Sequence, residues 1–181
     1  MARPTNLLDA CVLINLLASG EFEDIAGSTE EEFGVCSAVG KETAFLRAED
    51  TEVETQEPIV LEPLVSSGRL KVFDIESELE EELYVDYASQ LDDGEAMSLA
   101  IAESRGFLLA TDDRKARRLF LEATGIADHL VSTTDILRTW ADRQSPSAPR
   151  LKDALLRIRH RARFSPNQND RNFLWWQDAC R

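Results

Sequence analysis

Residues 107–113 read FLLATDD, a short apolar run that ends in a hydroxyl and two carboxylates. A run of this length, preceded by Gly106 and followed by acids, indicates a buried strand. Residues 94–105 have helical periodicity, and Gly106 fits the C-cap of that helix. A basic helix is predicted after the run, at residues 114–123. The stretch therefore predicts the order helix, strand, helix, with reactive side chains at the carboxyl end of the strand.

The same alternation extends in both directions along the chain. Further strands are predicted at residues 5–8, 33–39, 70–75 and 129–132, and further helices at 11–17, 41–48, 77–90 and 134–143. Ser77 and Glu80 form a capping-box pattern at the start of one helix. The acidic links 21–32 and 49–62 indicate solvated loops or exposed helix faces. Alternating elements imply right-handed crossovers, so we expect an α/β fold with three layers, α/β/α, around a central parallel sheet.

Length and composition favour one globular domain, with 181 residues, 43% apolar and 30% charged. The net charge of −14 argues against a general affinity for nucleic acid. Residues 143–181 differ, because they hold nine Lys or Arg against three acids, and a Ser- and Pro-rich linker lies at 145–149. We therefore expect a domain at residues 1–144 and a basic, Trp-containing, helical extension at 145–181 that packs on it.

The expected location is the cytoplasm. No apolar run approaches the roughly 20 residues that span a bilayer, and residues 1–6 do not resemble the start of a secretion signal. The three cysteines, Cys11, Cys36 and Cys180, lack the spacing of a zinc site. We expect reduced thiols, with Cys11 and Cys36 buried, and no membrane partner.

Carboxylates recur at the ends of the predicted strands and the starts of the helices: Asp9, Glu42, Glu95, Asp112 and Asp113. Each one alone is explained by helix capping or by the helix dipole. If four of them converge, each ionised pair repels by roughly 3–4 kcal/mol at an effective dielectric near 20. Mg²⁺ or Mn²⁺ would remove that repulsion, and the chain has no His/Cys cluster for zinc. Such a site suggests hydrolysis of a phosphodiester by metal-activated water.

Four segments of the chain, residues 7–16, 37–42, 93–96 and 108–114, resemble the motifs of the PIN-domain family, which includes VapC-like toxin ribonucleases. They occur in the family's order and cover residues 7 to about 140. The Gly-Glu-Ala sequence at 94–96 and Thr-Asp-Asp-Arg at 111–114 resemble a subgroup in which Glu replaces the Asp of many relatives. This resemblance implies a PIN-like fold.

The resemblance also implies the site residues. The catalytic, metal-binding set would be Asp9, Glu42, Glu95 and Asp113, with Asp112 as the alternative to Asp113. Thr111, Arg114 and Arg117 would bind or support the RNA substrate, although a basic helix can equally be a solvated face.

The implied function is metal-dependent endoribonuclease activity, as in the toxin of a VapBC-like pair, with an antitoxin protein and a second copy of the chain as partners. One alternative is a degenerate PIN domain that binds RNA or protein. A less favoured one is a receiver-like phosphoacceptor domain, which would need an acidic pair after its first strand. For the extension, single-stranded nucleic acid binding competes with packing of its apolar stripe and arginines on the acidic body, which we favour.

Overall fold

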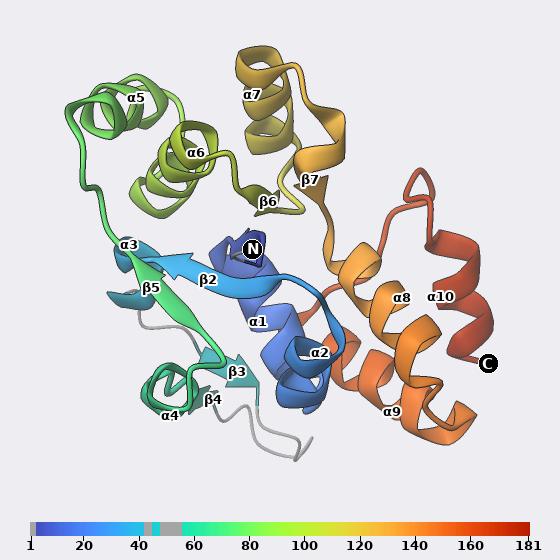
Figure 1. Cartoon of the computed structure of the whole chain (residues 1–181). Coiled ribbons are helices and arrows are strands. Elements are labelled where there is room, and N and C mark those ends of the chain that lie inside the picture. Colours follow the sequence, from blue (N-terminus) through green and yellow to red (C-terminus); the bar gives the residue numbers. More distant parts are fainter. Residues whose placement is uncertain (1–2, 42–44, 48–55) are drawn as a thin grey trace. The chain divides into compact units, whose positions relative to one another are not determined.

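Five short strands form a parallel sheet in the computed structural model of the chain, in the order β5-β2-β1-β6-β7 (Figure 1). The strands are β1 (Thr5–Leu8), β2 (Glu32–Cys36), β5 (Lys71–Phe73), β6 (Leu108–Ala110) and β7 (Leu130–Val131), and each neighbouring pair is parallel. The structure describes residues 3–41, 45–47 and 56–181. The expected α/β class, with helices around a central parallel sheet as in a three-layer α/β/α fold, is confirmed.

The helices alternate with these strands, as the periodicity predicted. They are α1 (Ala10–Ala18), α2 (Phe22–Ser28), α3 (Ser37–Lys41), α4 (Glu62–Ser66), α5 (Glu78–Ala88), α6 (Asp93–Arg105), α7 (Arg114–Thr124), α8 (Thr133–Gln144), α9 (Ala148–Arg157) and α10 (Phe173–Ala179), with short turns η1 (Ala127–His129) and η2 (Ile158–Ala162). Helix α2 lies in the acidic link 21–32 and buries Phe22 and Ile25. No described helix is long and apolar enough to cross a membrane.

One predicted helix is wrong where it can be checked. Within the predicted helix 41–48, Phe45–Arg47 form the strand β3, which pairs with β4 (Gln56–Pro58) in an antiparallel ribbon. Residues 42–44 and 48 of that prediction lie outside the described residues. The prediction rested on eight residues, and periodicity over so short a window does not separate a helix from a strand.

Local capping signals are confirmed at both ends of helices. The Ser77 hydroxyl accepts a hydrogen bond from the amide of Glu80 at 3.2 Å, which caps α5. The carboxylate of Glu80 accepts from the amide of Glu76 at 2.8 Å, one residue before the usual partner in a capping box. Gly106 ends α6 with φ of +65°, a left-handed conformation that favours glycine.

The chain divides into two compact units. Unit 1 comprises Met1–Val12, Glu30–Thr43 and Val60–Ser132, and it contains the parallel sheet with α5, α6 and α7. Unit 2 comprises Leu13–Thr29, Ala44–Ile59 and Thr133–Arg181. The boundary differs from the expected one at 144/145, because α8 and two earlier segments group with the C-terminal extension.

Unit 1 has its core between α6 and the centre of the sheet. Helix α6 contacts β1, β2 and β6, and α5 and α7 pack beside it. The buried side chains include Leu7, Leu8, Val35 and Leu109 from the strands, and Leu99, Ala100 and Ile101 from α6. Strand β1 lies between β2 and β6, so the residue that follows it emerges at the middle of the sheet edge.

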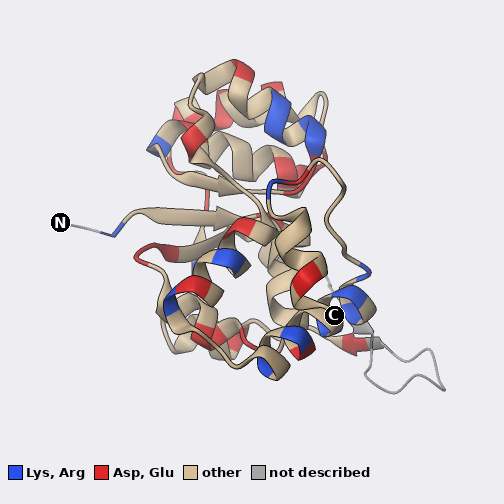
Figure 2. Ribbon diagram, turned by 90° about the vertical axis from the view of Figure 1, so that its right-hand side faces the viewer, with Lys and Arg blue, Asp and Glu red and all other residues tan. Residues whose placement is uncertain are grey.

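Unit 2 has a separate core, made of Leu16, Ile25, Ile136, Leu137, Trp140, Leu155 and Ile158. The arginines of the extension meet acidic side chains of the same unit. Arg150 pairs with Glu21 at 2.5 Å, Arg161 with Glu57 at 2.5 Å, and Arg171 with Asp135 at 2.6 Å. The ribbon coloured by charge shows acidic and basic positions intermixed (Figure 2). Within unit 2, arginines of the extension therefore meet acids at the start of α2, in α8 and in β4, and Leu155 and Ile158 are buried.

A buried ion pair in unit 1 gives a stability prediction. Arg105 donates two hydrogen bonds to the carboxylate of Glu80, at 2.7 and 2.9 Å, and a third to the carbonyl of Asp74 at 2.6 Å. Glu80 is only 3% exposed. We expect Arg105→Met to lower the free energy of unfolding by about 3 kcal/mol, because it leaves a buried charge without its partner. Urea denaturation at pH 7 measures this.

The same pair has a predictable pH dependence. The hydrogen bonds from Arg105 hold the pKa of Glu80 below its usual value. The pair therefore stabilises the fold at a pH above the usual pKa of a glutamate, and this stabilisation is lost as the pH falls through the lowered pKa. The difference between Arg105→Met and the parent should therefore shrink in acid. An equal difference at pH 3 and pH 7 would contradict the assignment.

Candidate functional site

The reversal point of the sheet lies between β1 and β6. From β1 the chain adds β2 and then β5 on one side, and it returns to add β6 and β7 on the other. In open α/β sheets, ligands bind beyond the carboxyl ends of the strands at this reversal. Asp9 follows β1 directly, and Thr111, Asp112 and Asp113 follow β6. The topology therefore brings two of the predicted motifs to the place where such folds hold ligands.

The register fixes how these residues meet. Leu8 is the partner of Ala110 in the β1/β6 pair, and the amide of Asp9 donates to the carbonyl of Ala110 at 3.0 Å. Asp9 is 3% exposed and Thr111 is 1% exposed. The buried Thr111 hydroxyl hydrogen-bonds to the Asp9 carboxylate. Thr111 therefore contacts the first of the predicted carboxylates, and its role in a functional site stays a prediction.

Asp9 also has a structural role. Its Oδ1 accepts a hydrogen bond from the amide of Val12 at 2.7 Å, which caps the first turn of α1. Capping requires only an acceptor at the start of a helix, whereas burying an ionised carboxylate is costly unless it is compensated. The near-complete burial of this charge beside other acids is therefore a cost that capping does not explain.

Burial raises the pKa of Asp9 from 3.8 to about 7. The hydrogen bonds from Thr111 and from Val12 act in the opposite direction, and the carboxylates of Asp112 and Glu95 raise the pKa further. The Asp9 carboxyl group is thus half-protonated near neutral pH when no cation is present. A cation bound beside it would restore the charged form.

Glu95 lies in the first turn of α6, where Asp92 caps the helix by accepting from the amide of Glu95 at 2.9 Å. Its side chain is half-buried. Burial raises the pKa of Glu95, and the carboxylates of Asp92 and Asp113 raise it further, against the ammonium of Lys115. Glu95 therefore belongs to the same acidic group as Asp9 and the residues after β6.

The two adjacent aspartates have different surroundings. Asp113 caps α7, because its Oδ1 accepts from the amides of Lys115 at 2.7 Å and Ala116 at 2.8 Å. Asp112 acts on the buried Asp9, whereas Asp113 acts on Glu95. The sequence favoured Asp113 as the ligand. Of the two, Asp112 is the one whose charge acts on Asp9, and one oxygen of Asp113 is already engaged by the amides of α7.

Cys11 lies at the rim of this group and is exposed, whereas we expected it to be buried. Partial burial raises the pKa of its thiol to about 12, and the carboxylates of Asp9, Asp112, Glu95 and Asp113 all add to the shift. One thiol thus experiences all four carboxylates. The apolar helical run around Cys11 led to the expectation of burial, and its position two residues after Asp9 was the signal that it lies near the acidic group.

The basic residues at the start of α7 have mixed roles. Arg117 donates from Nη1 to the carbonyls of Thr111 at 2.8 Å and of Val131 at 3.0 Å, so it ties the ends of β6 and β7 together. Sequence reasoning missed this structural role. Arg114 is exposed beside Asp113, and the ammonium of Lys115 donates to the carbonyl of Gln90. Substrate binding by Arg114 and Arg117 stays a prediction.

Glu42, the remaining predicted ligand, lies outside the described residues. Among residues 3–41, 45–47 and 56–181, no three His, Cys, Asp or Glu side chains are already close enough together to hold a metal ion. The available donors are carboxylate oxygens with a supporting hydroxyl, which is the chemistry that Mg²⁺ and Mn²⁺ prefer. The donor set therefore fits a hard divalent cation.

Comparisons of the chain with family models, with curated proteins and with solved structures found no match. The resemblance to PIN domains therefore stays a prediction, which rests on the four sequence motifs.

The buried charge of Asp9 predicts a pH-dependent stability. The unfolded chain ionises this carboxyl near pH 4 and the folded chain near pH 7, so stability falls as the pH rises between these values. In metal-free protein, Asp9→Asn should remove the penalty and keep the acceptor for Val12. We expect the variant to be more stable than the parent at pH 8, by about 2–4 kcal/mol, and similar to it at pH 4.

Thermal melts in EDTA at both pH values test this prediction. Glu122→Gln, an exposed change on α7, is the matched control and should not shift with pH relative to the parent. A parent that is as stable as Asp9→Asn at pH 8 would mean that the carboxylate is not destabilised by its surroundings.

Proposed function

We propose that this chain is a metal-dependent endoribonuclease of the PIN type that uses Mg²⁺ or Mn²⁺. The observation that carries the proposal is the buried carboxylate of Asp9 at the sheet reversal, beside Glu95 and Asp112, with its pKa raised to about 7. Asp9, Glu95 and Asp112 or Asp113 are the proposed ligands. Glu42 joins them on the strength of the sequence motif alone.

The electrostatics support a cation. Carboxylates that face one another in a partly buried site repel, and the repulsion is a few kcal/mol for each close pair. Asp9 is almost entirely buried among other carboxylates, and this burial destabilises the metal-free form of the protein. Binding of a divalent cation offsets this cost, so the site is arranged for the bound state.

In the proposed reaction the bound cation supplies an activated water and stabilises charge on the phosphate. Thr111 orients the Asp9 carboxylate through its hydroxyl, and the amide of Val12 holds the Oδ1 of the same group. Asp113 is held by two amides of α7, which keeps its second oxygen in a defined direction. Arg114, exposed beside it, would bind a phosphate of the RNA.

The strand order bears on the receiver-like alternative. Receiver domains have the order 2-1-3-4-5, with the first strand second from an edge. Numbered along the chain, the strands here have the order 3-2-1-4-5, and the first strand is central. This order, together with a single acid after β1, disfavours a phosphoacceptor site.

We further propose that the nuclease is the toxin of a VapBC-like pair in the cytoplasm, with an antitoxin that covers the acidic site and with a second copy of the chain as a partner. Motif resemblance is the support for this finer assignment. A degenerate PIN domain that binds RNA or protein is the alternative, and it would keep the fold while lacking turnover.

Cleavage of RNA is the deciding experiment. Purified protein should cut single-stranded or structured RNAs in Mg²⁺ or Mn²⁺ and should not cut in EDTA. Asp9→Asn and Glu95→Gln should each lower the rate by at least about 100-fold, since removal of a ligand charge disturbs the bound cation. Glu122→Gln, an exposed acid on α7, should cut like the parent.

Metal binding gives the proposal a second readout. Mn²⁺ should raise the melting temperature of the parent and of Glu122→Gln, but not of Asp9→Asn. A parent that neither cuts any RNA nor gains stability with metal would move the assignment to the degenerate binding module.

A pair of variants separates Asp112 from Asp113. We expect Asp112→Asn to weaken Mn²⁺ binding at least as strongly as Asp113→Asn, because Asp112 acts directly on the buried Asp9. Asp113→Ala should in addition lower stability by about 1 kcal/mol, since it removes the cap of α7. Calorimetric titration with Mn²⁺ and urea denaturation measure the two effects. A large loss of affinity for Asp113→Asn alone would restore the sequence-based choice.

A further inference from the structure

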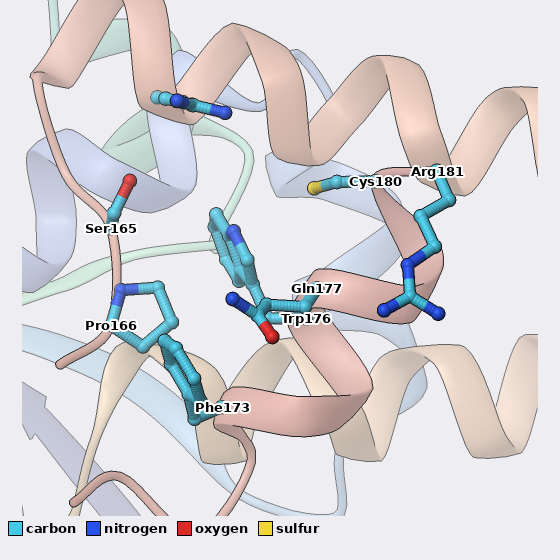
Figure 3. Close-up of a pocket in the computed structure, with 8 residues that line it drawn as sticks. Ser165, Pro166, Phe173, Trp176, Gln177, Cys180 and Arg181 are labelled. Carbon is cyan, nitrogen blue, oxygen red and sulfur yellow. The ribbon is translucent and has the colours of Figure 1, made fainter. Parts of the chain in front are cut away.

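Unit 2 contains a pocket of about 390 Å³ between the segment after η2 and helix α10 (Figure 3). This volume is at the small end of the range for ligand sites, about 300–1,000 Å³. The pocket is lined by Arg159, Ser165, Pro166, Phe173, Trp176, Gln177, Cys180 and Arg181. All of these residues belong to unit 2, so the pocket is separate from the carboxylates of unit 1.

One part of the lining is flat, apolar and fixed in place. Trp176 is 4% exposed, and its ring meets that of Phe164 edge to face, with centroids 5.8 Å apart. Pro166 is buried, and Phe173 is half-buried beside it. Aromatic rings that packing holds in place can stack on a ligand without a further loss of side-chain entropy on binding.

The lining also contains cationic side chains. Arg159 lines the pocket and is exposed. Burial raises the pKa of Cys180, and the charges of Arg159 and Lys152 act against that rise. Lys152 also donates to the carbonyl of Arg181 at 2.7 Å. Arg181 pairs with Asp178 at 3.0 Å, so Arg159 is the more available cation for a ligand.

Arg159 differs from the arginines that bind the extension to the other segments of unit 2. Arg150, Arg161 and Arg171 each meet a carboxylate of another segment of the unit. Arg159 instead lines the pocket together with Trp176 and Phe173, and with Ser165 and Gln177. These groups can accept and donate hydrogen bonds around a planar polar ring.

From this lining we propose that the pocket binds one nucleotide, with the base against the half-buried Phe173 and the exposed edge of Trp176, and with the phosphate on Arg159. A wholly apolar ligand would leave Arg159 unused, and a simple anion would leave the apolar lining unused. Both a free mononucleotide and an unpaired nucleotide of single-stranded RNA have the required chemistry. The proposal does not depend on the nuclease assignment.

The test is calorimetric titration of full-length Asp9→Asn protein, chosen so that RNA is not cut. The ligands are the four ribonucleoside monophosphates, the four nucleosides, inorganic phosphate and a five-nucleotide single-stranded RNA. We expect a monophosphate or the RNA to bind at least tenfold more tightly than either phosphate or the nucleosides. Binding by monophosphates would indicate a free nucleotide as the source, and binding by the RNA alone would indicate an unpaired residue.

Two variants locate the binding site. Arg159→Gln should weaken nucleotide binding at least tenfold, while Arg163→Gln, an exposed arginine on the same segment outside the lining, should not. Phe173→Leu should weaken binding of the nucleotide while leaving phosphate unaffected. Circular dichroism and melting temperatures establish that each variant is folded.

The proposal is overturned if none of the ligands binds, if phosphate binds as tightly as the nucleotides, or if binding persists in Arg159→Gln. If no nucleotide binds to the pocket but the parent still cuts RNA, the proposed function stands without this pocket. Nucleotide binding without any cleavage would instead remove the nuclease assignment and keep the pocket.

Discussion

The pairing of β1 with β6 is the constraint on which the proposed chemistry depends. Because Leu8 is the partner of Ala110, Asp9, the first acid after β1, comes beside Thr111, the first hydroxyl after β6. A shift of either strand by one residue would turn its side chains to the other face of the sheet. The two strands are separated by about 100 residues of sequence, yet their register is set by buried apolar side chains. Packing of the sheet therefore determines the position of the acidic group.

Charge is handled differently in the two units. In unit 2, acids at the start of α2 and in α8 have arginine partners from the extension. The positive charge of the extension is therefore largely offset by acidic side chains of the same unit. In unit 1, by contrast, Asp9 is buried among like charges, and the nearby Arg117 donates to backbone carbonyls. Arginine partners thus compensate acids in unit 2 and at Glu80 of unit 1, whereas Lys115 is the cation that acts on Glu95 where we propose that a metal binds.

The strands of the sheet could be placed from sequence because short apolar runs have clear flanking signals, as at residues 107–111. The predicted strand 33–39 was too long, because β2 ends at Cys36 and residues 37–39 begin α3. The β3–β4 ribbon could not, since antiparallel pairing of 45–47 with 56–58 is a tertiary contact that no local period encodes. For the site, the order of the motifs was enough to bring Asp9 and Thr111 together. It could not distinguish Asp112 from Asp113, because adjacent residues differ only in the direction of their side chains, which the start of α7 sets.

The cap that Asp9 places on α1 has an evolutionary consequence. The fold needs only an acceptor oxygen at this position, and an asparagine would supply one. Exchange of a single oxygen for nitrogen would therefore abolish the proposed ligand charge while relieving the buried repulsion. Loss of turnover would come with a gain in stability, so a lineage freed from selection for cleavage has an easy route to a stable, inactive relative.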